Sequence, residues 1–191
     1  MFTHRKFDVS LFRAVEFGEL VLPSRGEAVH DSSLGCNSEY ADLRGHSWAE
    51  ARRVLALESE LIRRIEKSPD VEAELESIEE SLYESPENLY GLDIGVASTV
   101  ICLSAANCIP FSSCNGGAFG GLHQEAYPLV VFFAKIQTAE RILGIAEGVN
   151  VGLVNRPGGC LMAYATNILS FRAFAAGLLK QRQVFSVTRR E

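Results

Sequence analysis

The sequence predicts an α+β fold, a four-stranded, mostly antiparallel sheet with helices on one face, preceded by an acidic helical hairpin. Two observations support this prediction. Several segments show apolar residues at helical spacing, and short apolar runs between them have the length of strands. After residue 91 these segments follow the order helix, strand, strand, twice, and then a last helix. This order fits helices packed on an antiparallel sheet.

Length and charge predict two parts in the chain. A chain of 191 residues can bury one good core, or one core with a small appendage. Residues 1–86 contain 10 Lys and Arg and 18 Asp and Glu, a net charge of −8, whereas residues 87–191 have a net charge of +2. We therefore predict an N-terminal region over 1–86 and an α+β domain over 87–191, with the boundary in "SPENLYG" at 85–91.

The first 46 residues give the weakest structural signals. Up to residue 23 the apolar residues occur at both strand and helix spacing, and a short strand is expected near residues 19–22. Residues 24–46 are polar and have no apolar period, so they are expected to form a loop. Long loops inside compact domains tend to be functional or disordered.

The acidic hairpin is predicted from two helix starts. Ser47 with Glu50 is a capping-box pattern, and "SPD" at 68–70 ends the first helix. Asp70 caps a second helix that runs to about residue 83. Its glutamates, at positions 74, 76, 79 and 80, are expected to face solvent. This acidic face is either only solvated or a docking surface for a basic protein partner.

The C-terminal part supplies the remaining elements. We expect Asn167 to cap the last helix. The predicted helices span residues 94–107, 136–148 and 167–183, and the predicted strands span 109–114, 126–134, 149–155 and 160–165.

The composition favours a cytoplasmic protein with no membrane segment. The start of the chain has no apolar core, so no secretory signal is expected. The uncharged run 94–124 is rich in Ser, Asn and Gly and contains Pro110, so it fits a buried helix and a strand better than a membrane span. The five cysteines are expected to be reduced thiols.

The stretch "CIPFSSCNGGAFGG" at 108–121 is the candidate binding site. It places four glycines and several small polar side chains at and directly after the end of a predicted strand. Backbone N–H groups in such a loop can form a concavity that binds anions. We expect Ser112, Ser113, Asn115, Gly116 and Gly117 to bind a ligand, with the two glycines needed for positive φ or for close approach.

The same loop holds candidate catalytic groups. Cys114, His123 and Glu125 lie within 12 positions, and a thiol, an imidazole and a carboxylate can act as nucleophile, base and orienting group. The alternative for Cys114 is inert packing, because cysteine is a common small core residue.

Several known motifs do not match. The gaps between Cys108, Cys114 and His123 fit no standard zinc-finger spacing, so no metal site is expected. "SCNGG" is similar to a segment of papain-like proteases, but the run around their catalytic cysteine does not occur here. Walker and dinucleotide-binding patterns do not occur either, and the sequence leaves the cofactor unknown.

One resemblance covers about ten residues. A helix, a strand and then Ser-Ser-Cys-x-Gly resembles the wybutosine-synthesis methyltransferases that act on tRNA, and a similar Ser-Cys-x-Gly-His signature occurs in small uncharacterised bacterial and phage proteins. Ser112, Ser113, Cys114 and Gly116 match, whereas Gly117 stands where those proteins have Arg or His. The resemblance implies a site in the loop but carries neither S-adenosylmethionine nor tRNA with it. A net charge of +2 also offers little to a phosphate backbone, so nucleic acid is not expected as a main partner.

The leading hypothesis is a bacterial-type α+β protein that binds a small polar or anionic ligand in the loop at 112–125. It includes catalysis by Cys114. The alternative is a non-enzymatic subunit of a multiprotein assembly that docks through the acidic hairpin.

Overall fold

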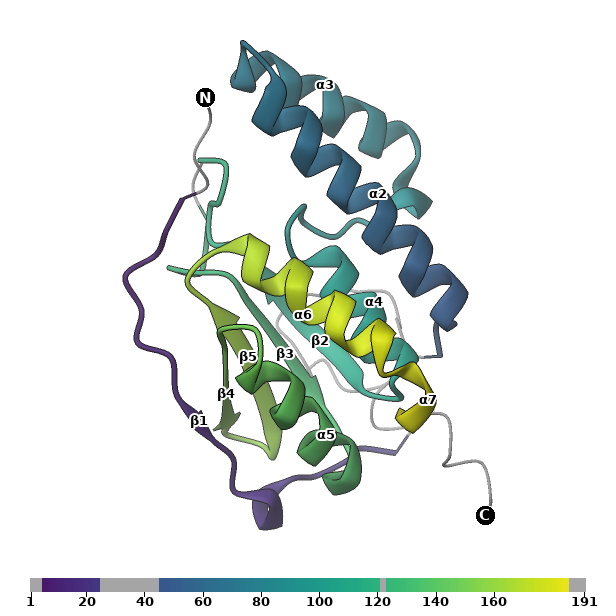
Figure 1. Cartoon of the computed structure of the whole chain (residues 1–191), viewed down its shortest axis with the longest axis vertical. Coiled ribbons are helices and arrows are strands. Elements are labelled where there is room, and N and C mark those ends of the chain that lie inside the picture. Colours follow the sequence, from purple (N-terminus) through teal and green to yellow (C-terminus); the bar gives the residue numbers. More distant parts are fainter. Residues whose placement is uncertain (1–4, 25–44, 121–122, 186–191) are drawn as a thin grey trace.

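The computed structural model describes residues 5–24, 45–120 and 123–185, and in them helices and one sheet form an α+β fold (Figure 1). The sheet has five strands in the order β1-β4-β5-β3-β2. They are β1 (Arg13–Ala14), β2 (Ile109–Cys114), β3 (Leu129–Phe133), β4 (Val151–Arg156) and β5 (Cys160–Ala165).

The prediction of a four-stranded, mostly antiparallel sheet is wrong, because a fifth strand makes the sheet mixed. Strands β2 to β5 pair antiparallel, and β1 adds a parallel pairing to β4, with Arg13 opposite Leu153. Two residues are too few to show a period, and their partners lie far along the chain. The strand expected near residues 19–22 is also wrong, since the regular structure there is a 3-10 helix, η1 (Phe17–Glu19).

The three predicted helix caps are confirmed. Ser47 accepts from the Glu50 N–H in a complete capping box, and the side chains of Asp70 and Asn167 each accept from the N–H three residues on. The helices are α2 (Trp48–Lys67), α3 (Val71–Glu84), α4 (Ala97–Ala105), α5 (Ile136–Glu147), α6 (Ile168–Lys180) and α7 (Arg182–Phe185), with a 3-10 turn η3 (Pro86–Asn88).

Different segments of the chain cover the two faces of the sheet. Helices α4, α5 and α6 lie over one face (Figure 1), where Val130 and Phe132 of β3 join the main core. Val131 and Phe133 point to the opposite face, in line with the two-residue period of a strand. There the N-terminal segment covers them with Val9 and Leu11.

The hairpin of α2 and α3 adjoins this core (Figure 1). The buried stripe of α2, which includes Val54 and Ile62, belongs to the same apolar cluster as α4, and every residue of α4 is buried. The boundary between 1–86 and 87–191 stays a prediction, but α2 shares the core of the second part. Most of the predicted polar loop, residues 25–44, lies outside the described residues.

The outer face of α3 is acidic, with one exception to the prediction. Glu76, Glu79 and Glu80 are exposed as expected, whereas Glu74 is half-buried and forms an ion pair of 2.6 Å with Arg64 of α2. This pair joins the two helices of the hairpin. Among the helices described, none has the length and apolar character needed to cross a membrane.

Candidate functional site

The Gly-rich loop begins where β2 ends, and Asn115 connects it to the segment before α4. The Asn115 N–H donates to Asp93 Oδ2 at 3.1 Å, and its side-chain amide donates to the Ile94 carbonyl at 3.1 Å. Its side-chain oxygen accepts from the Gly117 N–H at 2.9 Å. Asn115 is 6% exposed, and these bonds satisfy its buried polar groups. The bonds to Asp93 and Ile94 also join two segments that lie 21 to 22 residues apart.

Two glycines determine the backbone conformation of the loop. Gly116 and Gly117 have φ of +66° and +74°, the left-handed region that favours glycine, so the expected positive φ is confirmed. A Cβ on Gly116 would lie 2.5 Å from the Tyr127 carbonyl carbon, whereas a Cβ on Gly117 would lie 3.1 Å from His123 Cδ2. Gly116 therefore serves the fold, and Gly117 leaves room for the imidazole.

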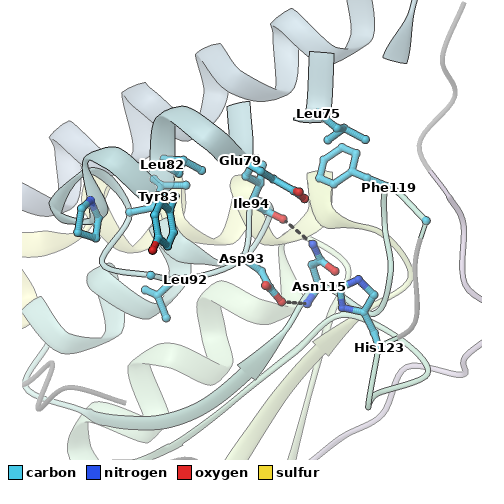
Figure 2. A pocket seen from close by; sticks show the side chains of 14 residues that line it. Leu75, Glu79, Leu82, Tyr83, Leu92, Asp93, Ile94, Asn115, Phe119 and His123 are labelled. Atoms are coloured by element: carbon cyan, nitrogen blue, oxygen red, sulfur yellow. Dashed lines mark hydrogen bonds between the residues drawn. The ribbon is translucent and has the colours of Figure 1, made fainter. Parts of the chain in front are cut away.

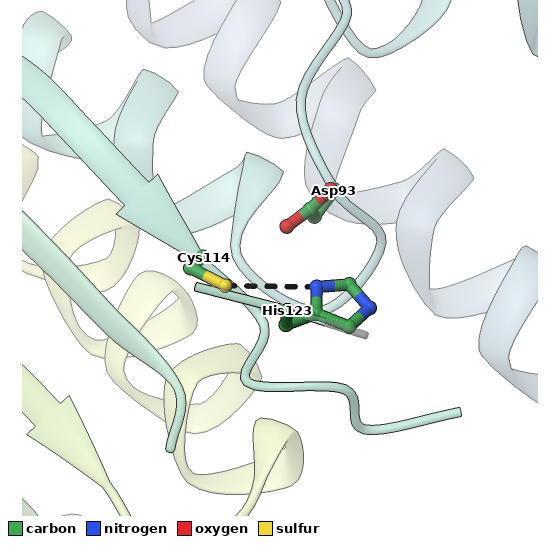
Figure 3. Close-up of side chains that lie close together, drawn as sticks. All are labelled: Asp93, Cys114 and His123. Carbon is green, nitrogen blue, oxygen red and sulfur yellow. Dashed lines mark hydrogen bonds between the residues drawn. The ribbon is translucent and has the colours of Figure 1, made fainter. Parts of the chain in front are cut away.

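Three chemically active side chains meet at the start of this loop (Figure 3). One ligand atom each from Asp93, Cys114 and His123 lies within 4.8 Å of the other two. Cys114 Sγ is 3.7 Å from His123 Nδ1, and the Gly116 N–H donates to the sulfur at 3.3 Å. Cys114 is buried, Asp93 is half-buried and His123 is exposed, so solvent reaches the cluster from the imidazole side.

A cavity of about 630 Å³ opens beside this cluster, between α3, the segment before α4 and the Gly-rich loop (Figure 2). Asp93 and His123 belong both to the cluster and to the cavity wall. Glu79 and Asn115 are the other polar side chains of the wall. The remaining wall is Leu75, Leu82, Tyr83, Pro86, Leu89, Leu92, Ile94 and Phe119, with Gly91 and Gly120.

The structure brings some of the predicted site residues together and separates others. Cys114 and His123 are in contact, and Asn115 lines the cavity. Ser112 and Ser113 lie within β2, opposite Val131 and Val130, and are not part of the cavity wall. Glu125 is exposed and lies outside the three-residue cluster.

Sequence reasoning missed two charged residues of this region. Asp93 takes the place near Cys114 and His123 that we assigned to Glu125; it lies 21 positions before Cys114, so its distance along the chain concealed it. Arg5 is the second, because its Nη1 would lie 3.5 Å from a Cβ on Gly117. Arg5 thus places a cation beside Gly117.

A buried carboxyl supports the site from α2. Glu58 accepts from the Gly95 N–H at 2.9 Å, from the Ser98 N–H at 3.3 Å and from the Ser98 hydroxyl. Burial raises the pKa of the Glu58 carboxyl. Glu58 thus caps the N-terminus of α4 from another helix and holds the turn that follows Asp93.

The other thiols of the described residues lie in protected surroundings. Burial raises the pKa of Cys102 to about 12 and also raises that of Cys108 and Cys160. Cys102 and Cys108 belong to the main core and Cys160 to the cluster on the opposite face of the sheet, whereas Cys114 belongs to neither.

Comparison with protein-family models, with curated proteins and with solved structures gives no match to this chain. The local resemblance to the wybutosine-synthesis methyltransferases therefore stays a prediction.

Proposed function

We propose that this protein binds a small molecule in the cavity beside the Gly-rich loop, with the reactive part of the ligand at Asp93, Cys114 and His123. The observation that carries this proposal is the shared wall, because Asp93 and His123 line the cavity and each also has a ligand atom within 4.8 Å of the Cys114 sulfur. A cavity of about 630 Å³ falls within the range of small-molecule sites, and a mostly apolar wall with a few convergent polar groups is typical of them.

The wall favours a ligand with an apolar body and a neutral or positively charged polar group. Its acidic and imidazole side chains are those of Glu79, Asp93 and His123, and the wall that the structure describes contains no lysine or arginine. The N–H groups of Asn115, Gly116 and Gly117 already donate inside the protein. This argues against the anionic ligand expected from the loop sequence, since those donors have internal acceptors.

Cys114 is the nucleophilic side chain at this end of the cavity. A thiolate either attacks an electrophilic carbon or binds a metal ion. A neighbouring imidazole acts as the base in the first case and can be a second metal ligand in the other. The Gly116 N–H and His123 lie beside the sulfur, and Asp93, rather than Glu125, is the carboxylate that lies near both the thiol and the imidazole.

A thermal-shift screen against neutral, cationic and anionic compounds tests the binding proposal. We expect hits among apolar neutral or cationic compounds, and Leu75→Trp should abolish their binding because Leu75 lines the cavity. Ser81→Trp, an exposed change on the same helix, is the matched control and should keep binding. No hit in any class, or equal binding by Leu75→Trp, would refute the proposal.

A second candidate function is docking of a basic protein segment to the outer face of α3. Tyr83 is 89% exposed and lies in a shallow depression with Glu76, Glu79 and Glu80. An exposed aromatic side chain among carboxylates suits a Lys- or Arg-rich peptide through cation–π contact and charge. Binding of a labelled oligolysine peptide should weaken in both Tyr83→Ala and Glu76→Lys. Unchanged binding by Tyr83→Ala would contradict this candidate.

A further inference from the structure

We propose that Asp93, Cys114 and His123 form a site for one zinc-type divalent ion, whose free coordination position faces the cavity. The three donors come from separate segments: the turn before α4, the end of β2, and the loop after it. Their ligand atoms lie within 4.8 Å of one another. The inference rests on the proposed function only in giving the free position to a cavity ligand.

The donor set fits zinc in chemistry, and its sulfur–nitrogen pair also fits zinc in spacing. Sulfur, imidazole nitrogen and carboxylate oxygen are the three donor types that Zn²⁺ uses, whereas Mg²⁺ and Ca²⁺ prefer oxygen. Zinc bonds of about 2.3 Å to sulfur and about 2.0 Å to nitrogen at a tetrahedral angle place these two atoms about 3.5 Å apart. The observed Sγ to Nδ1 distance of 3.7 Å is close to that value.

The arrangement differs from a catalytic triad of nucleophile, base and carboxylate. In a triad the carboxylate binds the imidazole nitrogen remote from the nucleophile, so the carboxylate and the nucleophile lie on opposite sides of the imidazole. Here the Asp93 carboxylate approaches the Cys114 sulfur as well as the imidazole (Figure 3). A thiolate and a carboxylate this close repel each other, and a divalent cation between them would replace the repulsion by attraction.

Outer hydrogen bonds orient two of the proposed ligands. The Gly116 N–H donates to Cys114 Sγ, and the Asn115 N–H donates to Asp93 Oδ2. Metal-binding thiolates and carboxylates commonly accept such bonds, which fix the ligand and tune its basicity. The N–H groups of Asn115 and Gly116 therefore donate to the proposed ligands themselves, which gives this part of the glycine-rich loop a role other than anion binding.

The fourth position follows from the cavity. Structural zinc sites are usually closed by four protein ligands, whereas catalytic sites have three and leave one position for water or substrate. Among the residues that the structure describes, three protein donors meet here, and Asp93 and His123 lie in the cavity wall. The proposed site differs from the set Cys108, Cys114 and His123, whose spacing fits no standard zinc finger. Asp93 takes the place of Cys108, which is buried in the main core.

Titration with Co²⁺ and Zn²⁺ after chelator treatment tests the site without any small molecule. We expect one equivalent of Co²⁺ to give a sulfur-to-cobalt charge-transfer band that Zn²⁺ displaces. Cys114→Ser should lose the band. His123→Ala should weaken Co²⁺ binding at least about tenfold, because loss of an outer-shell contact already costs about tenfold and loss of a ligand should cost no less. Glu125→Gln and Cys160→Ser are the matched controls and should bind like the wild type. Because His123 is exposed, its variant should stay folded, and thermal unfolding of every apo variant checks this.

Absence of the band in the wild type, or an unchanged band in Cys114→Ser, would overturn the metal site. The ligand screen is run both with chelator and with Zn²⁺, so the two proposals fail separately. Compounds that bind without a cobalt band would leave the proposed function standing and remove the metal. A cobalt band without any bound compound would do the reverse.

Discussion

Gly116→Ala should destabilise the protein for two reasons that the structure separates. An alanine at φ +66° costs about 1–2 kcal/mol, because its Cβ crowds the following carbonyl in the left-handed region. The added Cβ would also lie 2.5 Å from the carbonyl carbon of Tyr127, 2.6 Å from its Cα and 2.8 Å from the Pro128 nitrogen. These are backbone atoms at the start of β3, so a rotamer change cannot relieve the overlap.

The size of the effect follows from these two contributions. Overpacking of this kind costs about 1–3 kcal/mol, so we expect Gly116→Ala to lower the free energy of unfolding by about 2–5 kcal/mol in total. Gly91→Ala is the matched control, since Gly91 has φ +70° and a Cβ there would meet nothing within 4 Å. It should cost about 1–2 kcal/mol, from the backbone conformation alone.

Urea unfolding monitored by circular dichroism measures both variants. The difference between them isolates the overlap with Tyr127 and Pro128, because the two positions share nearly the same φ. Equal losses of stability in Gly116→Ala and Gly91→Ala would refute the reasoning, since the contact with β3 would then have no energetic consequence.

Three further predictions concern ionisable groups. Hydrogen bonds from Ser47 lower the pKa of Glu50 to about 2, so the stabilisation by this carboxylate is present above pH 4.5 and is lost as the pH falls towards 2. Glu50→Gln should remove this pH dependence of the unfolding free energy, measured in urea. It should cost about 1 kcal/mol, a small value because the Glu50 side chain is 41% exposed. Burial raises the pKa of Glu58, so the contribution of this carboxyl to stability is complete below pH 4.5 and is lost as the pH rises through its folded-state pKa. Glu58→Gln should flatten this decline of the unfolding free energy with pH. An unchanged pH profile would contradict the raised pKa. In chelator-treated protein, iodoacetamide should label Cys114 at least about tenfold faster than Cys102, whose pKa is about 12; peptide mass spectrometry measures both, and equal rates would indicate that Cys114 is a packing residue.

Local signals predicted the helices and the central strands well. Ser47, Asp70 and Asn167 each cap a helix through a contact three residues away, which is why sequence alone located them. The bounds of β2 are also as predicted, since a short apolar run between a helix and glycines is a local pattern. β1 could not be predicted, because its partner lies about 140 residues away and two residues carry no period.

The candidate site was predicted in part for the same reason. Cys114 and His123 lie nine positions apart in one loop, and the loop composition indicated them. Asp93 reaches the cluster only through the tertiary fold, held by Asn115 and by the turn that Glu58 caps. Glu125 was chosen for its closeness in sequence, but the chain turns it towards solvent.

The parallel pairing of β1 with β4 has a consequence for folding during synthesis. Arg13 Nε donates to the Val151 carbonyl 138 residues away, and the Phe12 N–H donates to the Tyr164 hydroxyl 152 residues away. At translation rates of about 5–20 residues per second, the N-terminal segment leaves the ribosome roughly 7–30 s before its partners exist. It therefore docks late, and until then the sheet face around Val131 stays uncovered, as a surface that chaperones or other nascent chains can bind.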